Sequence, residues 1–123
     1  MTLESTPKMT VFGIPNCDTV KKARTWLTAN GQDFMFHDFK KLGVPADQLP
    51  QWLAAVSWEK LVNRKGTTWR QLDAATQAAV KDDASASALM LAYPSVIKRP
   101  VVVWSDGGVS VGFDAASFAA RLP

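Results

Sequence analysis

The sequence contains one cysteine, Cys17, at a position where a thiol could act as a nucleophile. A short apolar run ends in the turn Gly13-Ile14-Pro15, and a helical pattern begins directly after the cysteine. The N–H groups at a helix start have no intrahelical partner, and the helix dipole is positive there. Both effects favour the thiolate, which is the nucleophilic form of cysteine. The structural alternative is a small buried apolar residue, which is the common role of a lone cysteine.

The residues after Cys17 determine what a reactive thiol could do. The chain continues Asp18-Thr19-Val20, so no resolving thiol stands three residues further on. Any catalytic disulfide must therefore form with another molecule. Lys21 lies one helical turn beyond Cys17 on the same face. It could add positive potential near the thiol, and its alternative is a solvated surface lysine.

Two arginines are candidates for holding an anion. Arg64 lies in the polar, glycine-containing segment Asn63–Arg70, which we predict to be a loop, and loops often carry binding residues. Arg99 directly precedes Pro100, and an X-Pro bond is a candidate for the cis form. Guanidinium groups near a thiolate would lower its pKa and bind an oxyanion or carboxylate through paired hydrogen bonds. The alternative for each arginine is a surface salt bridge, because spacing alone does not place either beside Cys17.

Other chemistries have little support in the composition. His37 is the only histidine and lies in an aromatic segment, so we expect it to pack rather than catalyse. The sequence has no Cys/His cluster for a metal and no glycine-rich phosphate loop. The net charge of +3 is scattered, without a basic run of five, so we expect no nucleic-acid partner. No apolar run reaches about 18 residues, so we expect no membrane-spanning helix.

The elements that must position these residues alternate in type at both ends of the chain. We predict a strand at Met9–Gly13, a helix from Asp18 to about Asn30, and a second strand at Asp33–Phe39. Two strands joined through a helix form a parallel pair with a right-handed crossover. The β-α-β order places Cys17 between the first strand and its helix.

The rest of the chain is predicted to be helical in its middle and to end in β-β-α order. Pro45 fits the first turn of a helix, and Asp73 can cap another. A β-branched run at Ile97–Trp104 predicts a strand whose hairpin partner is Val109–Phe113, and Asp114 can cap a final helix.

We therefore predict one α/β domain over residues 9–123, with a helical insertion at about residues 44–96. Residues 1–8 are interpreted as a loose polar extension, because they contain no apolar stretch of the kind that a secretory signal needs. With one cysteine and no such signal, the expected compartment is a reducing cytoplasm.

Three segments, in the same order, resemble the arsenate reductase (ArsC) family. They are Gly13–Arg24, Leu61–Gly66 and Ile97–Val101. The form Asn-Cys-Asp-Thr-Val-Lys-Lys-Ala-Arg and the ending Val111-Gly112-Phe113 are most similar to the YffB branch of that family. The resemblance covers about Met9 to Leu122. It implies a thioredoxin-like mixed sheet with an inserted helical subdomain.

The resemblance also implies roles for individual residues. Cys17 would be the nucleophile, Arg64 and Arg99 would hold an anion around it, and Pro100 matches the cis proline of thioredoxin-like folds. With the two neighbours Asn16 and Lys21, these residues make up the predicted site for the nucleophile and its substrate. They are Cys17, Arg64, Arg99, Pro100, Asn16 and Lys21.

The function that the resemblance implies is that of a glutathione-dependent thiol reductase. Family members use glutathione and glutaredoxin as electron donors, so we expect glutathione as co-substrate, glutaredoxin as a candidate partner, and no bound cofactor. The substrate would be an anionic small molecule or a thiol compound. The alternatives are arsenate reduction by Cys17, and a non-catalytic regulator of the Spx type that binds RNA polymerase.

Three departures from the related branches bear on these alternatives. Arsenate reductases proper carry a histidine four residues before the cysteine, where this chain has Gly13. They also carry a third arginine after the last strand, where this chain has Gly112-Phe113-Asp114. Spx regulators usually carry Cys-x-x-Cys, and here Val20 replaces the second cysteine. A site with one cation fewer binds an oxyanion more weakly, because a charge-assisted contact is worth roughly 1.5–3 kcal/mol.

Overall fold

The chain folds into two compact units. The computed structural model describes residues 9–122, so the predicted extension at residues 1–8 lies outside the described residues. The first unit combines residues 9–38 with residues 99–122, and the second is Phe39–Lys98. The second unit contains helices and no strand among its described elements, and it includes the region where we expected the helical insertion.

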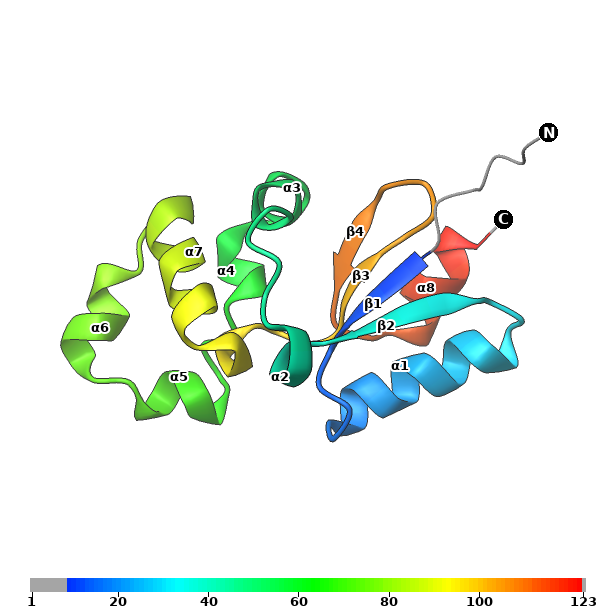
Figure 1. Cartoon of the computed structure of the whole chain (residues 1–123), viewed down its shortest axis with the longest axis horizontal. Coiled ribbons are helices and arrows are strands. Elements are labelled where there is room, and N and C mark those ends of the chain that lie inside the picture. The colour runs from blue at the N-terminus through cyan, green and yellow to red at the C-terminus, as the bar shows by residue number, and fades with distance from the viewer. Residues whose placement is uncertain (1–8, 123) are drawn as a thin grey trace. The chain divides into compact units, whose positions relative to one another are not determined.

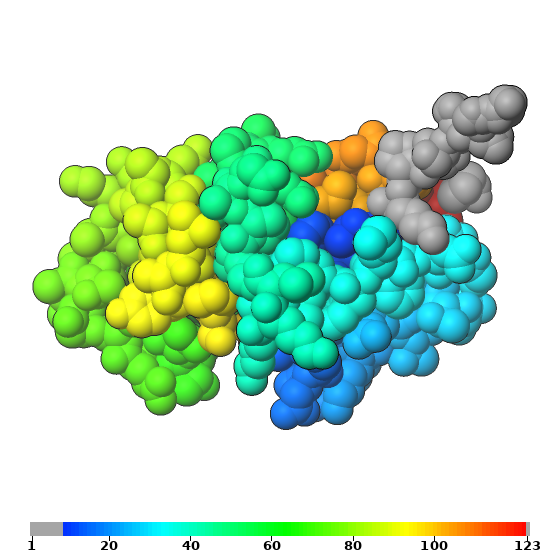
Figure 2. All heavy atoms as spheres, in the orientation of Figure 1, coloured from blue at the N-terminus to red at the C-terminus, as the bar shows by residue number. Residues whose placement is uncertain are grey.

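The first unit contains a four-stranded mixed sheet in the order β2-β1-β3-β4 (Figure 1). Its elements are β1 (Met9–Gly13), α1 (Asp18–Ala29), β2 (Phe34–Asp38), β3 (Val101–Val103), β4 (Val109–Val111) and α8 (Ala115–Arg121). β1 and β2 are parallel, whereas β1 with β3 and β3 with β4 are antiparallel. The predicted β-α-β and β-β-α order is confirmed. On the face shown in Figure 2, α1 and β2 lie next to each other.

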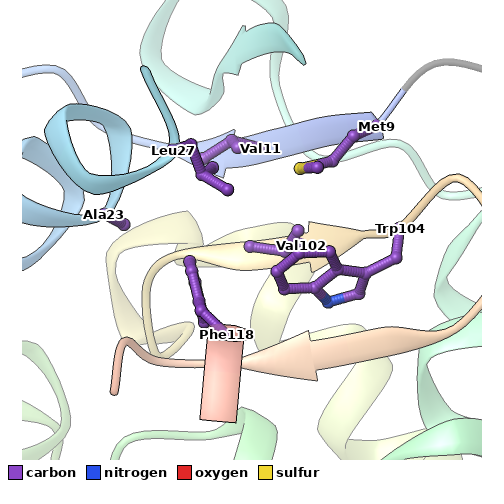
Figure 3. Close-up of a cluster of buried hydrophobic side chains, with 7 residues drawn as sticks. All are labelled: Met9, Val11, Ala23, Leu27, Val102, Trp104 and Phe118. Carbon is purple, nitrogen blue, oxygen red and sulfur yellow. The ribbon is translucent and has the colours of Figure 1, made fainter. Parts of the chain in front are cut away.

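The main core of the first unit lies on one face of the sheet, where both helices pack (Figure 3). Its buried side chains come from alternating strand positions and from one stripe of each helix. They are Met9, Val11, Ala23, Leu27, Val102, Trp104 and Phe118. The Phe118 ring of α8 meets the Trp104 ring edge-on, with 4.9 Å between the ring centroids. Strand periodicity of two and helix periodicity of 3.6 together produce this single apolar layer.

The second unit is built from short helices. They are α2 (Phe39–Leu42), α3 (Leu49–Ala55), α4 (Trp58–Leu61), α5 (Thr67–Gln71), α6 (Ala74–Ala79), α7 (Asp83–Ala92) and the 3₁₀ turn η1 (Pro94–Val96). The Phe39 and Trp52 rings lie 6.3 Å apart between centroids, and both side chains are buried. Val62 and Ile97 form an isolated antiparallel bridge, which joins the segment after α4 to the end of this unit.

Several predicted boundaries differ from the structure for local reasons. Pro45 does not start a helix, because it opens a turn in which its carbonyl accepts the Gln48 N–H at 2.9 Å, and α3 begins at Leu49. The expected loop Asn63–Arg70 is partly helical, since the extended Gly66 lets α5 begin at Thr67.

The strand predictions were also too long. β2 ends at Asp38, and Phe39 is the buried first residue of α2. β3 covers only Val101–Val103, because Pro100 has no N–H for the ladder and Ile97 pairs with Val62 instead. The predicted caps are confirmed, since Asp73 and Asp114 accept N–H groups at the starts of α6 and α8.

The end of β1 is in close contact with the first turn of α1. A Cβ atom at Gly13 would lie 2.8 Å from Cγ2 of Val20, a side chain that is fully buried. Real Cβ atoms essentially never approach so closely, so any larger residue at Gly13 must displace Val20. The glycine therefore allows the helix that begins after Cys17 to pack directly on the end of the strand.

We predict that Gly13→Ala destabilises the protein by about 1–3 kcal/mol, because Val20 is β-branched and buried and has little freedom to move aside. Chemical denaturation of the purified variant measures the free energy of unfolding. Gly108→Ala is the matched control, since its Cβ would meet the flexible guanidinium end of Arg121 at 2.8 Å. If Gly13→Ala lowers the free energy of unfolding no more than Gly108→Ala does, the proposed close packing is contradicted.

Candidate active site

Cys17 is the residue that caps the N-terminus of α1. Its backbone is extended, with φ of −141° and ψ of 122°, and the helix begins at the next residue. The side chain is half-buried, so it is neither a core residue nor fully solvated. The position predicted from the turn and the helix pattern is confirmed, and a half-buried thiol at a helix start is open to a partner molecule.

Competing effects set the acidity of this thiol. Burial raises the pKa of Cys17, whereas the Val20 N–H, the hydrogen bond and charge of Arg99, and the Thr19 N–H lower it. The net result is a pKa below the ordinary value of 9.0. The sulfur does not form a capping hydrogen bond of standard geometry. We therefore attribute the effect of the two N–H groups to their favourable interaction with the thiolate charge.

The sheet topology explains why Arg99 reaches the thiol. β1 and β3 are antiparallel with Phe12 opposite Val101, so the end of β1 lies beside the start of β3. Cys17 follows β1 and Arg99 precedes β3, which brings both to the same end of the sheet. Arg99 is half-buried, and its cationic side chain hydrogen-bonds to Cys17. One of the two predicted cations is therefore beside Cys17.

Pro100 connects Arg99 to Val101, the first residue of β3. The Arg99–Pro100 peptide bond is cis, as the resemblance implied, and Pro100 is buried. Its carbonyl accepts the N–H of Gly112 at 2.8 Å, which ties the start of β3 to the end of β4. Pro100 thus fixes the backbone from which the Arg99 side chain extends.

Arg64 belongs to the second unit, so its approach to Cys17 stays a prediction. Within that unit its guanidinium lies 3.9 Å from a carboxylate oxygen of Glu59, and both side chains are about half exposed, at 48% and 56%. The guanidinium carbon also lies 5.5 Å from the centre of the Trp58 ring. These contacts orient a cation that remains accessible to solvent.

The remaining predicted residues lie around the helix start. Asn16 is exposed in the bend directly before Cys17. Lys21 is exposed in the first turns of α1, and its backbone N–H donates to the Cys17 carbonyl at 2.9 Å. His37 packs against Phe12, with 4.9 Å between ring centroids, as expected for a packing residue. Neither Asn16 nor Lys21 contributes to the lowered pKa of the thiol.

Thr19 and Val20 contribute to the site but were not among the residues predicted from the sequence. Their backbone N–H groups lower the pKa of Cys17, and the signal for this role was the helix start itself rather than their side chains.

Within residues 9–122, no three His, Cys, Asp or Glu side chains gather as a metal site would require. None of the helices in that range has the length and apolar character needed to cross a membrane.

We predict that Arg99→Gln raises the pKa of Cys17, because both the hydrogen bond and the charge of Arg99 favour the thiolate. The rate of alkylation by iodoacetamide, followed against pH, measures this pKa. Loss of the cation should shift the profile to higher pH and slow alkylation at pH 7. Lys98→Gln serves as the control, since Lys98 is the exposed neighbour and does not affect the thiol. An unshifted profile in Arg99→Gln would contradict the assigned contact.

Comparison with known proteins places this architecture in a family. The model of the ArsC family matches residues 12–120. A solved structure named YFFB is 44% identical, covers 94% of this chain and all of its own, and superposes with a TM-score of 0.87. The solution structure of an arsenate reductase (ArsC) related protein from Brucella melitensis is 48% identical, with coverage of 96% and 97% and a TM-score of 0.72.

Curated sequences give two further relatives. An uncharacterized protein of Haemophilus influenzae is 37% identical over 114 residues, which are 93% of this chain and 98% of that protein. The global transcriptional regulator Spx of Streptococcus mutans is 25% identical over 120 residues, 94% of this chain and 83% of the regulator. The family match spans most of the chain and includes the cysteine turn, the arginine segments and the final helix. This chain belongs to the ArsC family and has its thioredoxin-like fold.

Proposed function

We propose that this protein is a monothiol oxidoreductase that reduces glutathione mixed disulfides with glutathione as the reductant. The observation that carries this proposal is a single thiol whose pKa is lowered by Arg99 and by the start of α1. A more acidic thiol supplies more thiolate near neutral pH, and the thiolate is the attacking species in disulfide exchange.

The reaction consists of two exchange steps. The Cys17 thiolate attacks the glutathione sulfur of a mixed disulfide, which forms a Cys17–glutathione disulfide and releases the substrate as its thiolate. A second glutathione thiolate then attacks the glutathione sulfur of that adduct. Cys17 leaves as the thiolate, and oxidised glutathione is the product. Because the chain has no second cysteine, the incoming glutathione is the reductant: its sulfur is oxidised to the disulfide level while the substrate sulfur is reduced to the thiol.

Cations around the thiol would serve both steps. Arg99 stabilises Cys17 as the attacking group and again as the leaving group, because the thiolate forms at both points. Glutathione carries two carboxylates, and a guanidinium can bind a carboxylate through two parallel hydrogen bonds. Arg64 has this role in the proposal, since it is exposed and is oriented by a partly solvated pair with Glu59 and by the Trp58 ring. Glutaredoxin is the candidate protein donor that could replace the second glutathione.

Arsenate reduction is the second candidate function. Its support is the relationship to the Brucella melitensis protein, whose name links it to arsenate reductase. Arsenate would use the same nucleophile, with Cys17 attacking arsenic in place of sulfur. At Gly13, where arsenate reductases proper carry a histidine, even a Cβ would collide with Val20. Position 13 therefore supplies no histidine, and the third arginine of arsenate reductases proper is also missing, which favours the thiol substrate over the oxyanion.

Regulation of the Spx type is supported by the relationship to Spx regulators such as that of Streptococcus mutans. The second cysteine of the Spx redox pair corresponds to Val20, which is fully buried and lowers the pKa of Cys17 through its N–H. A disulfide switch within the chain therefore has no partner thiol. Binding of RNA polymerase that persists in Cys17→Ser, in a protein without reductase activity, would support the regulator instead.

We predict that Cys17→Ser abolishes reduction of a glutathione mixed disulfide of a small thiol, because the hydroxyl is a far weaker nucleophile than the thiolate. A coupled glutathione reductase assay measures turnover. The circular dichroism spectrum and free energy of unfolding should stay close to wild type, since Cys17 is half-buried. Activity retained by the serine variant would contradict the mechanism. Faster turnover of arsenate than of the mixed disulfide, with glutathione and glutaredoxin supplied, would favour arsenate reduction.

We predict that Arg64→Gln raises the KM for the glutathione mixed disulfide by about tenfold, since a lost charge-assisted hydrogen bond is worth roughly 1.5–3 kcal/mol. Steady-state kinetics at saturating glutathione measures this KM, and the pH profile of Cys17 alkylation should not change. Glu59→Gln is the matched control: it removes the competing carboxylate and should leave KM equal or lower. An unchanged KM in Arg64→Gln would remove Arg64 from the proposed site.

A further inference from the structure

A shallow groove follows α1 away from the thiol. It has a volume of about 520 Å³ and is lined by Lys21, Arg24, Thr25, Thr28, Ala29 and Phe34. Five of these residues belong to α1, and Phe34 is the first residue of β2. In Figure 2, these two elements lie side by side on the surface of the first unit. The groove is open to solvent and belongs wholly to this unit.

The groove begins in the first turns of the helix that Cys17 caps. Lys21, Arg24 and Thr28 stand four, seven and eleven residues after the cysteine, which places all of them on one face of the helix. Lys21 to Ala29 spans about 12 Å at 1.5 Å per residue. An extended peptide rises about 3.3 Å per residue, so about three or four peptide residues would cover the groove.

The two cations lie toward the cysteine end, and the far end is apolar. None of the six lining residues is acidic, and Lys21 and Arg24 form no ion pair with an acidic residue in the part of the chain described. The guanidinium carbon of Arg24 lies 4.1 Å from the centre of the Phe36 ring, so an aromatic contact holds this cation near β2. Ala29 and Phe34 line the opposite end of the groove.

We propose that this groove binds an acidic peptide segment of a protein substrate, whose glutathionylated cysteine is reduced at Cys17. The segment would carry acidic residues next to its cysteine, facing Lys21 and Arg24, and an apolar residue further on, facing Ala29 and Phe34. This inference rests on the proposed reductase function and names its substrate class. The exchange steps are unchanged: Cys17 attacks the glutathione sulfur, and the protein cysteine leaves as the thiolate.

The binding test uses the Cys17→Ser protein, in which no exchange reaction can occur. Its probes are fluorescein-labelled Ser-Glu-Glu-Leu-Leu and the matched Ser-Gln-Gln-Leu-Leu, with affinity measured by fluorescence anisotropy at low salt. We expect the glutamate peptide to bind about fivefold more tightly, as ion pairs at an exposed site allow, and the difference to shrink at high salt. Equal affinities would overturn the proposal, as would tighter binding of a labelled oligonucleotide than of the glutamate peptide.

Variants on one helix separate this groove from general charge effects. Thr28→Glu adds a negative charge within the groove and should weaken binding of the glutamate peptide, as should Arg24→Gln. Lys22→Glu changes the charge of an exposed residue of α1 that does not line the groove, and it should weaken binding less. Equal weakening by Lys22→Glu and Thr28→Glu would overturn the proposal. Thr28→Glu keeps the test decisive if Arg24→Gln disturbs the contact with Phe36.

A kinetic experiment distinguishes this proposal from the reductase function on which it rests. Wild-type protein is assayed with the glutathionylated peptides Cys-Glu-Glu-Leu-Leu and Cys-Gln-Gln-Leu-Leu and with a small mixed disulfide. A higher kcat/KM for the glutamate peptide, lost in Thr28→Glu, supports the groove. Turnover of the small disulfide without preference between the peptides overturns the groove alone. Absence of turnover with all three substrates overturns the reductase function.

Discussion

The contact between Gly13 and Val20 is the constraint on which the site depends. The absence of a side chain at the end of β1 lets the first turn of α1 lie directly against the strand. That placement leaves the N–H groups of Thr19 and Val20 near the sulfur of Cys17, where they favour its ionised form. The buried Val20 thus has two roles: its side chain fixes the helix, and its backbone acts on the thiol. Small changes at this junction would affect packing and acidity together.

The half-buried position of Cys17 affects both the pKa of the thiol and its access to other molecules. Burial disfavours the thiolate, yet a fully solvated sulfur would gain little from a nearby cation, because water screens charge interactions. The half-buried position retains the influence of Arg99 while leaving the sulfur open to a second molecule. The same reasoning applies to α1 beyond the thiol, where Lys21 and Arg24 extend the positive potential along the surface. The candidate nucleophile therefore caps the same helix that carries the candidate binding surface.

Much of the fold was predictable from local sequence signals. Gly13-Ile14-Pro15 ended the first strand, the 3.6-residue pattern of Val20, Ala23 and Leu27 defined α1, and Asp73 and Asp114 marked helix starts. These signals work because turns, caps and amphipathic helices depend on residues close together in the chain. The helix start predicted at Pro45 was wrong, since a proline fits both a helix start and a turn. The outcome there depended on the neighbouring turn rather than on the proline itself.

The sequence by itself determined the candidate nucleophile, its place at a helix start and the lack of a second thiol to resolve a disulfide, because these follow from one cysteine and its immediate neighbours. Only the tertiary structure decided that Arg99, 82 positions later in the chain, lies beside Cys17. Antiparallel pairing of β1 with β3 brings the two together, and strand pairing between distant segments leaves no local trace in the sequence. Likewise, the collision of any Cβ at Gly13 with Val20 arises from packing, which spacing along the chain does not reveal.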